Sequence, residues 1–242
     1  MHLLALDTST EACSAALGVC LPGEPERVLT RAAEAPRGHA ELILPMVESL
    51  LAEAGLSLSS LGAIAFARGP GSFTGLRLAA AVTQGLAFGA GLPVLAVSTL
   101  RASALQALQR APSATHVLVC NDARMGEVYV AAFARGAGGL PEPLGPESVC
   151  PPSSVVMPAT SGVWVGAGHG FRAYPQLEQA APASSRPGEA RPGFTEIFAD
   201  LLPQAREVLP LARAEWAAGR ILKPAEAQPV YLRDDVAKVP QA

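Results

Sequence analysis

Apolar and polar positions follow two different rhythms along the first half of the chain. Between residues 11 and 19 apolar side chains recur at every second position, which is typical of a β-strand. From Gly38 the spacing becomes helical, and Gly55 follows as a predicted C-cap. Pro45 lies early in this run and predicts a kink or a late helix start. The elements predicted for the first 110 residues are three strands, a helix, a strand, a helix, a strand and a helix, at residues 3–6, 11–19, 27–33, 39–54, 61–67, 74–88, 94–97 and 99–110.

This alternation of strands and helices favours a mixed sheet flanked by helices. A second unit of the same kind is predicted after residue 110, because it also begins with a strand, an acidic turn and another strand. A duplicated α/β design has this appearance. The elements predicted there are strands at 116–121, 127–133 and 163–165, loop over 136–160, an exposed stretch at 181–193, and helix over 194–218 that breaks at Pro203 and Pro210.

Composition supports a large core and excludes several classes of protein. Half of the 242 residues are apolar and 16% are charged, against about 25% charged in an average soluble protein. Global disorder is therefore excluded. The formal net charge of −3 argues against a chain that binds nucleic acid by itself, although a nucleic acid held mostly by a partner stays open.

The expected location is the cytoplasm, without a membrane partner. No run of about 18 apolar residues predicts a transmembrane helix, and no basic segment precedes the apolar start. The four cysteines lack C-x-x-C spacing and are interpreted as buried free thiols.

The first candidate site is the turn after the first strand, where Asp7 is followed by Thr8, Ser9 and Thr10. A carboxylate with hydroxyls at a β-turn suits a phosphate and its Mg²⁺, with Asp7 facing the metal or its waters. The alternative is that Asp7 and Thr8 close the hairpin through bonds from side chain to backbone.

The second candidate is a glycine-rich turn from a strand into a helix, residues 68–77 (RGPGSFTGLR). Free N–H groups at a helix start bind anions. However, the segment lacks the Gly-Lys-Ser/Thr of a P-loop and the glycine pattern of a dinucleotide-binding fold. The alternative is a tight connection with Thr74 as N-cap, which accounts for the glycines but not for Arg68 and Arg77.

The third candidate is the segment 122–129 (DARMGEVY). Asp122 stands at a predicted strand end, where it could mirror the Asp7 turn across a cleft. The alternative is a hairpin that an ion pair of Arg124 stabilises. Asp7, Thr8 and Asp122 are therefore the weak candidates for contact with a nucleotide.

Two predicted helices, 39–54 and 74–89, carry features of an interface. Small residues at i, i+4 and i+8 in the second helix would let another helix approach closely, and the first helix is apolar over roughly half its circumference. Both helices either cover one large core or leave a face for a partner. The residues predicted for that face are Leu42, Met46, Leu50, Leu78, Ala81, Val82, Gly85, Leu86 and Gly89.

No catalytic or metal-binding motif stands out. The four histidines, His2, His39, His116 and His169, lack the H-x-x-x-H and H-E-x-x-H spacings of metal sites. Neither G-x-S-x-G nor a pair of glycosidase-like carboxylates is evident. We therefore expect no metal site and no catalytic residue.

Six segments together resemble one family. In chain order they are residues 4–10 (LALDTST), 39–46 (HAELILPM), 68–77, 97–100 (VSTL), 122–129 and 229–233 (PVYLR). They resemble the bacterial TsaB (YeaZ) family of tRNA threonylcarbamoyladenosine biosynthesis proteins, over residues 3–233. One departure is the tail, where family members often carry a tryptophan and this chain continues with residues 234–238 (DDVAK).

The resemblance implies an α/β fold of the actin, sugar-kinase and Hsp-type (ASKHA, ribonuclease H-like) class, with two lobes around a cleft. The lobes expected are residues 1–99, with the partner-binding helices, and 100–220, smaller and partly degenerate, followed by a C-terminal segment and polar tail at 221–242. It also implies a non-catalytic scaffold that acts with the paralogue TsaD and the ATPase TsaE in forming N6-threonylcarbamoyladenosine beside the anticodon of tRNAs reading codons that start with A.

The resemblance implies that no cofactor is required, and it leaves residual binding of ATP or ADP with Mg²⁺ open. It also implies that the chain contacts tRNA only within the complex. Two other hypotheses about the function remain open when the residues alone are considered. The chain could be a stand-alone ATP-dependent phosphotransferase, with Asp7 and Thr8 at the metal and phosphate and Asp122 as second acid. It could also be a module that forms a homodimer through helices 39–54 and 74–89.

Overall fold

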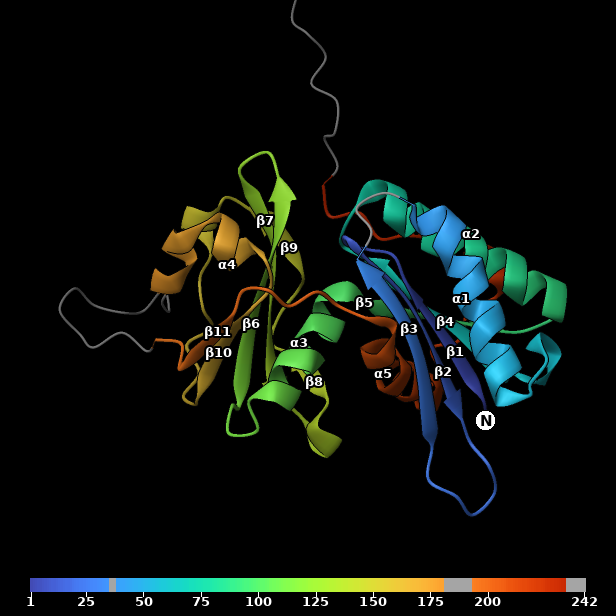
Figure 1. Ribbon diagram of the computed structural model, residues 1–242. Coiled ribbons are helices and arrows are strands. Elements are labelled where there is room, and N and C mark those ends of the chain that lie inside the picture. The colour runs from blue at the N-terminus through green and yellow to red at the C-terminus, as the bar shows by residue number, and fades with distance from the viewer. Residues whose placement is uncertain (35–37, 181–192, 234–242) are drawn as a thin grey trace, which may run out of the picture.

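The computed structural model describes residues 1–34, 38–180 and 193–233. In this part of the chain two α/β lobes lie side by side, and each is built on its own mixed sheet with helices against it (Figure 1). The expected α/β fold with two mixed sheets flanked by helices is confirmed.

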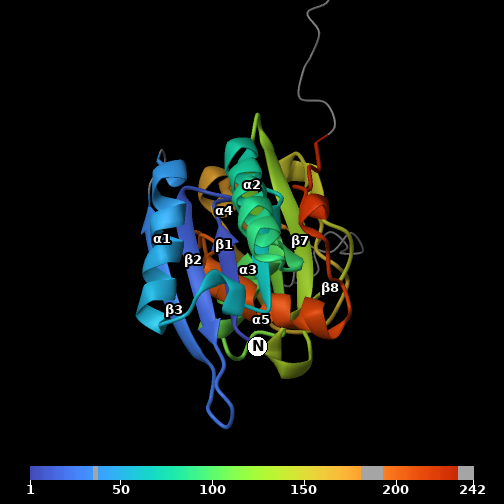
Figure 2. The same cartoon turned by 90° about the vertical axis from the view of Figure 1, so that its right-hand side faces the viewer.

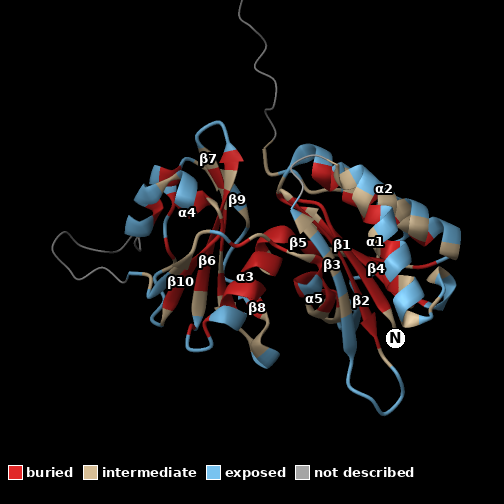
Figure 3. Ribbon diagram, in the orientation of Figure 1, coloured by how far each residue is buried: buried red, intermediate tan, exposed pale blue. Residues whose placement is uncertain are grey.

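The first sheet has the strand order β3-β2-β1-β4-β5. Strands β1 to β3 pair antiparallel, whereas β1, β4 and β5 run parallel. Every residue of β1 and β2 is buried, while β3 at the edge is exposed along most of its length (Figure 3). Strands covered on both faces need continuous apolar runs, and the sequence LLALD of β1 provides one as far as Asp7. The bounds are β1 Leu3–Asp7, β2 Ala12–Val19, β3 Arg27–Glu34, β4 Ala63–Gly69 and β5 Val94–Ser98.

Helices cover both faces of this sheet. On one face α1 (His39–Ala54) and α2 (Phe73–Ala90) pack through Ile43, Val47 and Ala79, and they lie next to each other on the outside of the molecule (Figure 2). On the other face lie α3 (Thr99–Arg110) and α5 (Ala205–Ala217).

The second sheet has the order β11-β10-β6-β7-β8, and β9 also pairs with β7. Helix α3 covers one of its faces, so this helix packs against both sheets. The other face is covered by α4 (Gly170–Ala173) and the 3-10 turn Pro175–Gln179. The strands are β6 His116–Arg124, β7 Glu127–Arg135, β8 Pro141–Pro143, β9 Ser148–Cys150, β10 Trp164–Ala167 and β11 Glu196–Phe198.

Helix α5 follows the second sheet in sequence yet packs on the first. The first lobe therefore draws core residues from both the start and the last fifth of the chain. The division of the chain at residues 99 and 220 stays a prediction, and the residues of the predicted tail from 234 onward lie outside the described residues.

Several local predictions were wrong. Helix α1 begins at His39, so the late start predicted from Pro45 is wrong, while the alternative of a kink there stays a prediction. The break predicted at Pro210 is wrong, because Pro210 lies within α5. In α5 the burial of Val208, Leu209 and Leu211 against the first sheet offsets the cost of the proline. The segment before α5 is a strand and an extended stretch instead of helix, because β11 obtains its backbone partners from β10. The predicted loop over 136–160 contains β8 and β9, which both add to the edge of β7. The predicted exposed stretch at 181–193 lies almost wholly outside the described residues.

Within the described ranges, no helix combines the length and the apolar content that crossing a membrane requires.

Candidate functional site

A cleft of about 950 Å³ lies between the two lobes. Its first-lobe wall includes residues 9–11 after β1 and residues 70–75, where the glycine loop leads into α2, and its second-lobe wall includes Asn121, Asp122 and Arg124 at the end of β6. Residues 9–11 of the Asp7 turn and Asp122 of the second acidic turn, which are far apart in the chain, thus line one cavity.

Asp7 ends β1 in a fully buried position. Its Oδ1 accepts hydrogen bonds from the Ser9 backbone N–H at 2.8 Å and from the Ser9 hydroxyl at 2.6 Å, whereas Oδ2 has no partner among the described residues. Burial raises the pKa of Asp7 to about 6, and the bonds from Ser9 oppose this rise. Asp7 therefore closes its own turn, as the alternative interpretation expects, and does so with one oxygen still unpaired.

The glycine loop folds directly onto this turn. The Thr8 hydroxyl donates to the carbonyl of Gly75 at 2.7 Å, and the Ser72 N–H donates to the carbonyl of Ser9 at 2.8 Å. A Cβ at Gly75 would lie 1.9 Å from the Thr8 carbonyl oxygen, so only glycine allows this approach. The N-cap of α2 is Ser72, whose hydroxyl accepts from the Gly75 N–H, and the alternative with Thr74 as N-cap is wrong.

The two arginines that flank the loop have partners within the chain. Arg68 pairs with Glu147 at 3.3 Å, and Arg77 lies 3.7 Å over the ring of Phe73 and donates to the Tyr231 hydroxyl at 3.0 Å. The tight connection between β4 and α2 thus accounts for the glycines, and these contacts account for the arginines.

The three candidate nucleotide contacts do not share one surface. Asp7 and Thr8 are fully buried behind the cleft wall, and the hydroxyls of Thr8 and Ser9 are already donors inside the protein. Asp122 lines the cleft. In this arrangement the turn offers no free hydroxyl of Thr8 or Ser9 to a phosphate, and contact of Asp7 and Thr8 with a nucleotide stays a prediction.

Asp122 lines the cleft and forms the ion pair with Arg124 that the alternative interpretation expects, while its contact with a nucleotide stays a prediction. Its Oδ2 pairs with Arg124 at 3.0 Å, and Oδ1 accepts from the Arg124 N–H at 2.8 Å and from the Tyr174 hydroxyl at 3.1 Å. Arg124 also reaches Glu11 of the first lobe at 3.2 Å. The ion pair stabilises the tip of the hairpin, where Arg124 and Met125 have positive φ, and at the same time connects the two cleft walls.

Two further polar residues of the cleft were missed from the sequence. Asn121 is 3% exposed, and its Oδ1 has no hydrogen-bond partner in the described part of the chain. Nδ1 of His169 likewise has no hydrogen-bond partner there, and burial lowers the pKa of His169. The sequence feature that could have indicated these residues is the motif Gly166-x-Gly168-x-Gly170. A Cβ at Gly168 would lie 2.2 Å from Asn121 Oδ1, so the glycine is explained by the neighbouring asparagine.

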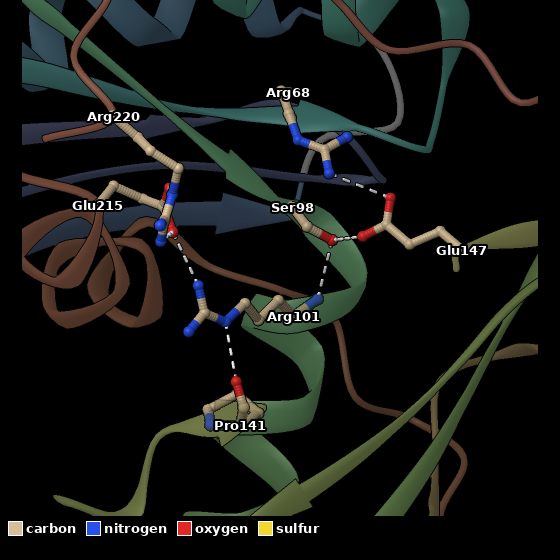
Figure 4. A network of polar contacts seen from close by, with 7 residues as sticks. All are labelled: Arg68, Ser98, Arg101, Pro141, Glu147, Glu215 and Arg220. Carbon is tan, nitrogen blue, oxygen red and sulfur yellow. Dashed lines mark hydrogen bonds and ion pairs between the residues drawn. The ribbon is translucent and has the colours of Figure 1, made fainter. Parts of the chain in front are cut away.

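A second polar connection joins the lobes on the side of α3 (Figure 4). Ser98, the N-cap of α3, donates its hydroxyl to Glu147 from the loop between β8 and β9 and accepts from the Arg101 N–H at 3.1 Å. The Arg101 side chain donates to the Pro141 carbonyl at 2.9 Å and pairs with Glu215 of α5 at 2.9 Å. These contacts join α3 to both β8 and α5.

The residues predicted for a partner face fall into three groups. Leu50 is fully buried and packs against the first sheet instead of on the outer face, because it lies on the same helix side as Ile43 and Val47. The half-buried ones are Leu42, Met46, Leu78, Val82 and Leu86, and the exposed ones are Ala81, Gly85 and Gly89.

The exposed glycines of α2 have no steric role toward the described residues. A Cβ at Gly85 or Gly89 would meet none of their atoms within 4 Å. Phe88, on the same helix, is 83% exposed. The outer side of α2 therefore presents the small residues Ala81, Gly85 and Gly89 next to the exposed ring of Phe88.

The four cysteines are free thiols, as expected. Cys13 and Cys120 are buried, and burial raises the pKa of Cys13 to about 11, whereas Cys20 and Cys150 are only half-buried. In the ranges that the structure describes, no group of three or more His, Cys, Asp or Glu side chains is placed to hold a metal ion.

Comparison with known proteins identifies the family. A family model described as TsaD, tRNA N6-adenosine threonylcarbamoyltransferase, matches residues 31–163. The protein "tRNA threonylcarbamoyladenosine biosynthesis protein TsaB" of Escherichia coli is 42% identical over 239 residues, which are 98% of this chain and 96% of that protein. The Haemophilus influenzae protein of the same name is 38% identical over 243 residues, which are 98% of this chain and 95% of that one.

A solved structure, YeaZ from Pseudomonas aeruginosa, superposes with a TM-score of 0.82 at 44% identity, covering 96% of this chain and 99% of that one. The two-lobed ASKHA-type fold that the resemblance implies is thereby confirmed. The chain belongs to the TsaB (YeaZ) family, within the wider group of TsaD-type proteins.

Proposed function

We propose that this protein is a scaffold and activator subunit, without chemistry of its own, in the formation of N6-threonylcarbamoyladenosine in tRNA. Its partners are a TsaD-type paralogue that carries out the transfer and the ATPase TsaE. The modified adenosine lies beside the anticodon of tRNAs reading codons that start with A. Similarity over nearly the whole chain to proteins named for this biosynthesis supports the proposal.

The observation that carries the pairing role is the outer side of α2. Glycine inside a helix costs about 0.5–1 kcal/mol relative to alanine. Gly85 and Gly89 bear this cost although a Cβ at either position would meet nothing within the chain. Close approach of a helix from a second chain would explain both glycines, and the exposed ring of Phe88 beside them would then be covered.

The non-catalytic role is supported by the state of the Asp7 turn. One oxygen of its carboxylate and the hydroxyls of Thr8 and Ser9 form internal hydrogen bonds, and the glycine loop covers the turn. A metal-assisted phosphotransferase needs such groups free to face its substrate.

A stand-alone ATP-dependent phosphotransferase or ATPase is the second candidate. It is favoured by the cleft itself, where Asp122 lies beside the unpaired polar atoms of Asn121 and His169. Under the first proposal these groups leave at most residual affinity for ATP or ADP with Mg²⁺. We further propose a cytoplasmic location, contact with tRNA only within the complex, and a homodimer through α1 and α2 when the paralogue is absent.

The deciding experiment is reconstituted threonylcarbamoyl transfer to tRNA with the TsaD-type and TsaE proteins, with and without this chain. ATP hydrolysis by the chain alone is measured beside it. Transfer that depends on this chain, with no hydrolysis by the chain alone, is the expected result. Strong hydrolysis by the lone chain with no effect on transfer would favour the phosphotransferase instead.

The interface is tested by Gly85→Leu. The added side chain projects from the outer side of α2, so the affinity for the TsaD-type partner is expected to fall by about a hundredfold, as measured by titration calorimetry. Ala217→Leu, on the exposed end of α5, is the matched control and should leave pairing unchanged. Unchanged affinity of Gly85→Leu, with its monomer folded, would show that the partner does not sit on α2.

A further inference from the structure

The described chain ends in a short segment, residues 229–233, that crosses from one lobe to the other. Figure 1 shows it in red, passing between α2 and the β6–β7 hairpin. Tyr231, Leu232 and Arg233 of this segment line the same cleft as the two acidic turns.

The first-lobe end of the segment is held by backbone and ring contacts. The Val230 N–H donates to the Arg68 carbonyl at 2.8 Å, and a Cβ at Gly69 would lie 2.8 Å from the Val230 carbonyl oxygen. The Tyr231 ring lies 5.5 Å from the Phe73 ring, and its hydroxyl accepts from Arg77. These contacts seat the segment firmly on the start of α2.

The second-lobe end is held differently. Arg233 forms an ion pair with Glu127 and donates to the Arg124 carbonyl at 3.4 Å, both at the tip of the β6–β7 hairpin. The Arg233 side chain is 17% exposed and that of Glu127 32%, so the pair is partly shielded from solvent. A single ion pair is weaker and more sensitive to salt than the contacts at the other end.

We propose that residues 229–233 form a strap that ties the two lobes together over the mouth of the cleft, with the Arg233–Glu127 pair as its releasable end. On release the strap stays attached at Val230, while the exposed Arg124–Glu11 pair opens and the hairpin and the second-lobe wall move away from the glycine loop. The contacts of α3 with β8 and α5 stay in place and keep the two lobes joined on that side. The strap goes beyond the proposed scaffold role and does not depend on it.

The test is hydrogen–deuterium exchange of the full chain, followed by mass spectrometry, for the wild type and Arg233→Ala. Release of the strap exposes both cleft walls together, so amides in residues 9–12 and in 121–128 should exchange about tenfold faster. Residues 229–231 should keep their protection. The wild type in 1 M salt should shift in the same direction, because salt screens the ion pair.

Two variants separate the strap from a local effect. The double exchange Arg233→Glu with Glu127→Arg should restore slow exchange on both walls. Arg172→Ala, which removes an ion pair to Asp200 inside the second lobe, is the matched control and should change neither wall. Unchanged exchange in Arg233→Ala would overturn the proposal, and so would faster exchange confined to 121–128, since the pair would then only stiffen the hairpin.

Discussion

The glycines at positions 69–75, where the glycine loop leads into the first turn of α2, and those further along α2 belong to one continuous stretch of chain, but different constraints act on them. A side chain at Gly71 or Gly75 would strike backbone atoms of Ser9 and Thr8 at 2.4 and 1.9 Å. A Cβ at Gly85 or Gly89 would meet nothing within 4 Å among the described residues. The fold therefore explains Gly71 and Gly75, whereas contacts among the described residues do not explain Gly85 and Gly89. Sequence shows glycine in both places and only the structure separates the two causes.

The largest effect that this comparison predicts is for Gly75→Ala. The new Cβ would meet a carbonyl oxygen of the buried β1–β2 turn, which cannot give way as a flexible side chain would. We expect a loss of about 3 kcal/mol in the free energy of unfolding, measured by urea denaturation of the isolated chain. A loss below about 0.5 kcal/mol would contradict the close packing of the loop on the turn.

The second prediction concerns the carboxyl group of Asp7, which the glycine loop covers. Because burial raises the pKa of Asp7 from 3.8 to about 6, the folded state holds a proton that the unfolded state releases between these two pH values. The free energy of unfolding should therefore fall as the pH rises from about 4 to about 6. Burial likewise raises the pKa of Glu207 in α5 from 4.5 to about 7, which extends the fall to about pH 7.

Asp7→Asn should remove the lower part of this fall and stabilise the protein at pH 8 by about 2 kcal/mol, because no buried charge has to form. Glu207→Gln should remove the upper part. Urea denaturation across this pH range measures both. An unchanged pH dependence in the two variants would mean that neither carboxyl is sealed from water.

The sequence predicted the first lobe well because its elements are long and strongly periodic. The order of strands and helices up to Arg110 and the C-cap at Gly55 are confirmed. The short strands β8, β9 and β11 were missed, because three residues carry no measurable period and gain their bonds from partners far along the chain.

The candidate site could be only partly predicted from the sequence, again because it depends on contacts between residues far apart in the chain. The turns at Asp7 and Asp122 were found as motifs, and both lie at or directly behind the walls of one cleft. That Asn121 and His169 lie in the same cleft depends on the parallel pairing of β6 with β10, across more than forty residues. The burial of Asp7 depends on the glycine loop, which no pattern within residues 4–10 reveals.

The smallest effect that the comparison predicts is for Gly85→Ala, and it tests most directly what the comparison says about the glycines further along α2. In Gly85→Ala the added methyl meets no atom and the helix loses a flexible residue, so the isolated chain should gain about 0.5–1 kcal/mol in the free energy of unfolding. Urea denaturation measured beside Gly75→Ala, the same substitution ten residues earlier in the same helix, supplies the matched control. Opposite signs for the two variants would show that the fold requires glycine at 75 and only tolerates it at 85. A loss of stability in Gly85→Ala would instead mean that the isolated chain already covers this side of α2, and the case for an external helix at that position would fail.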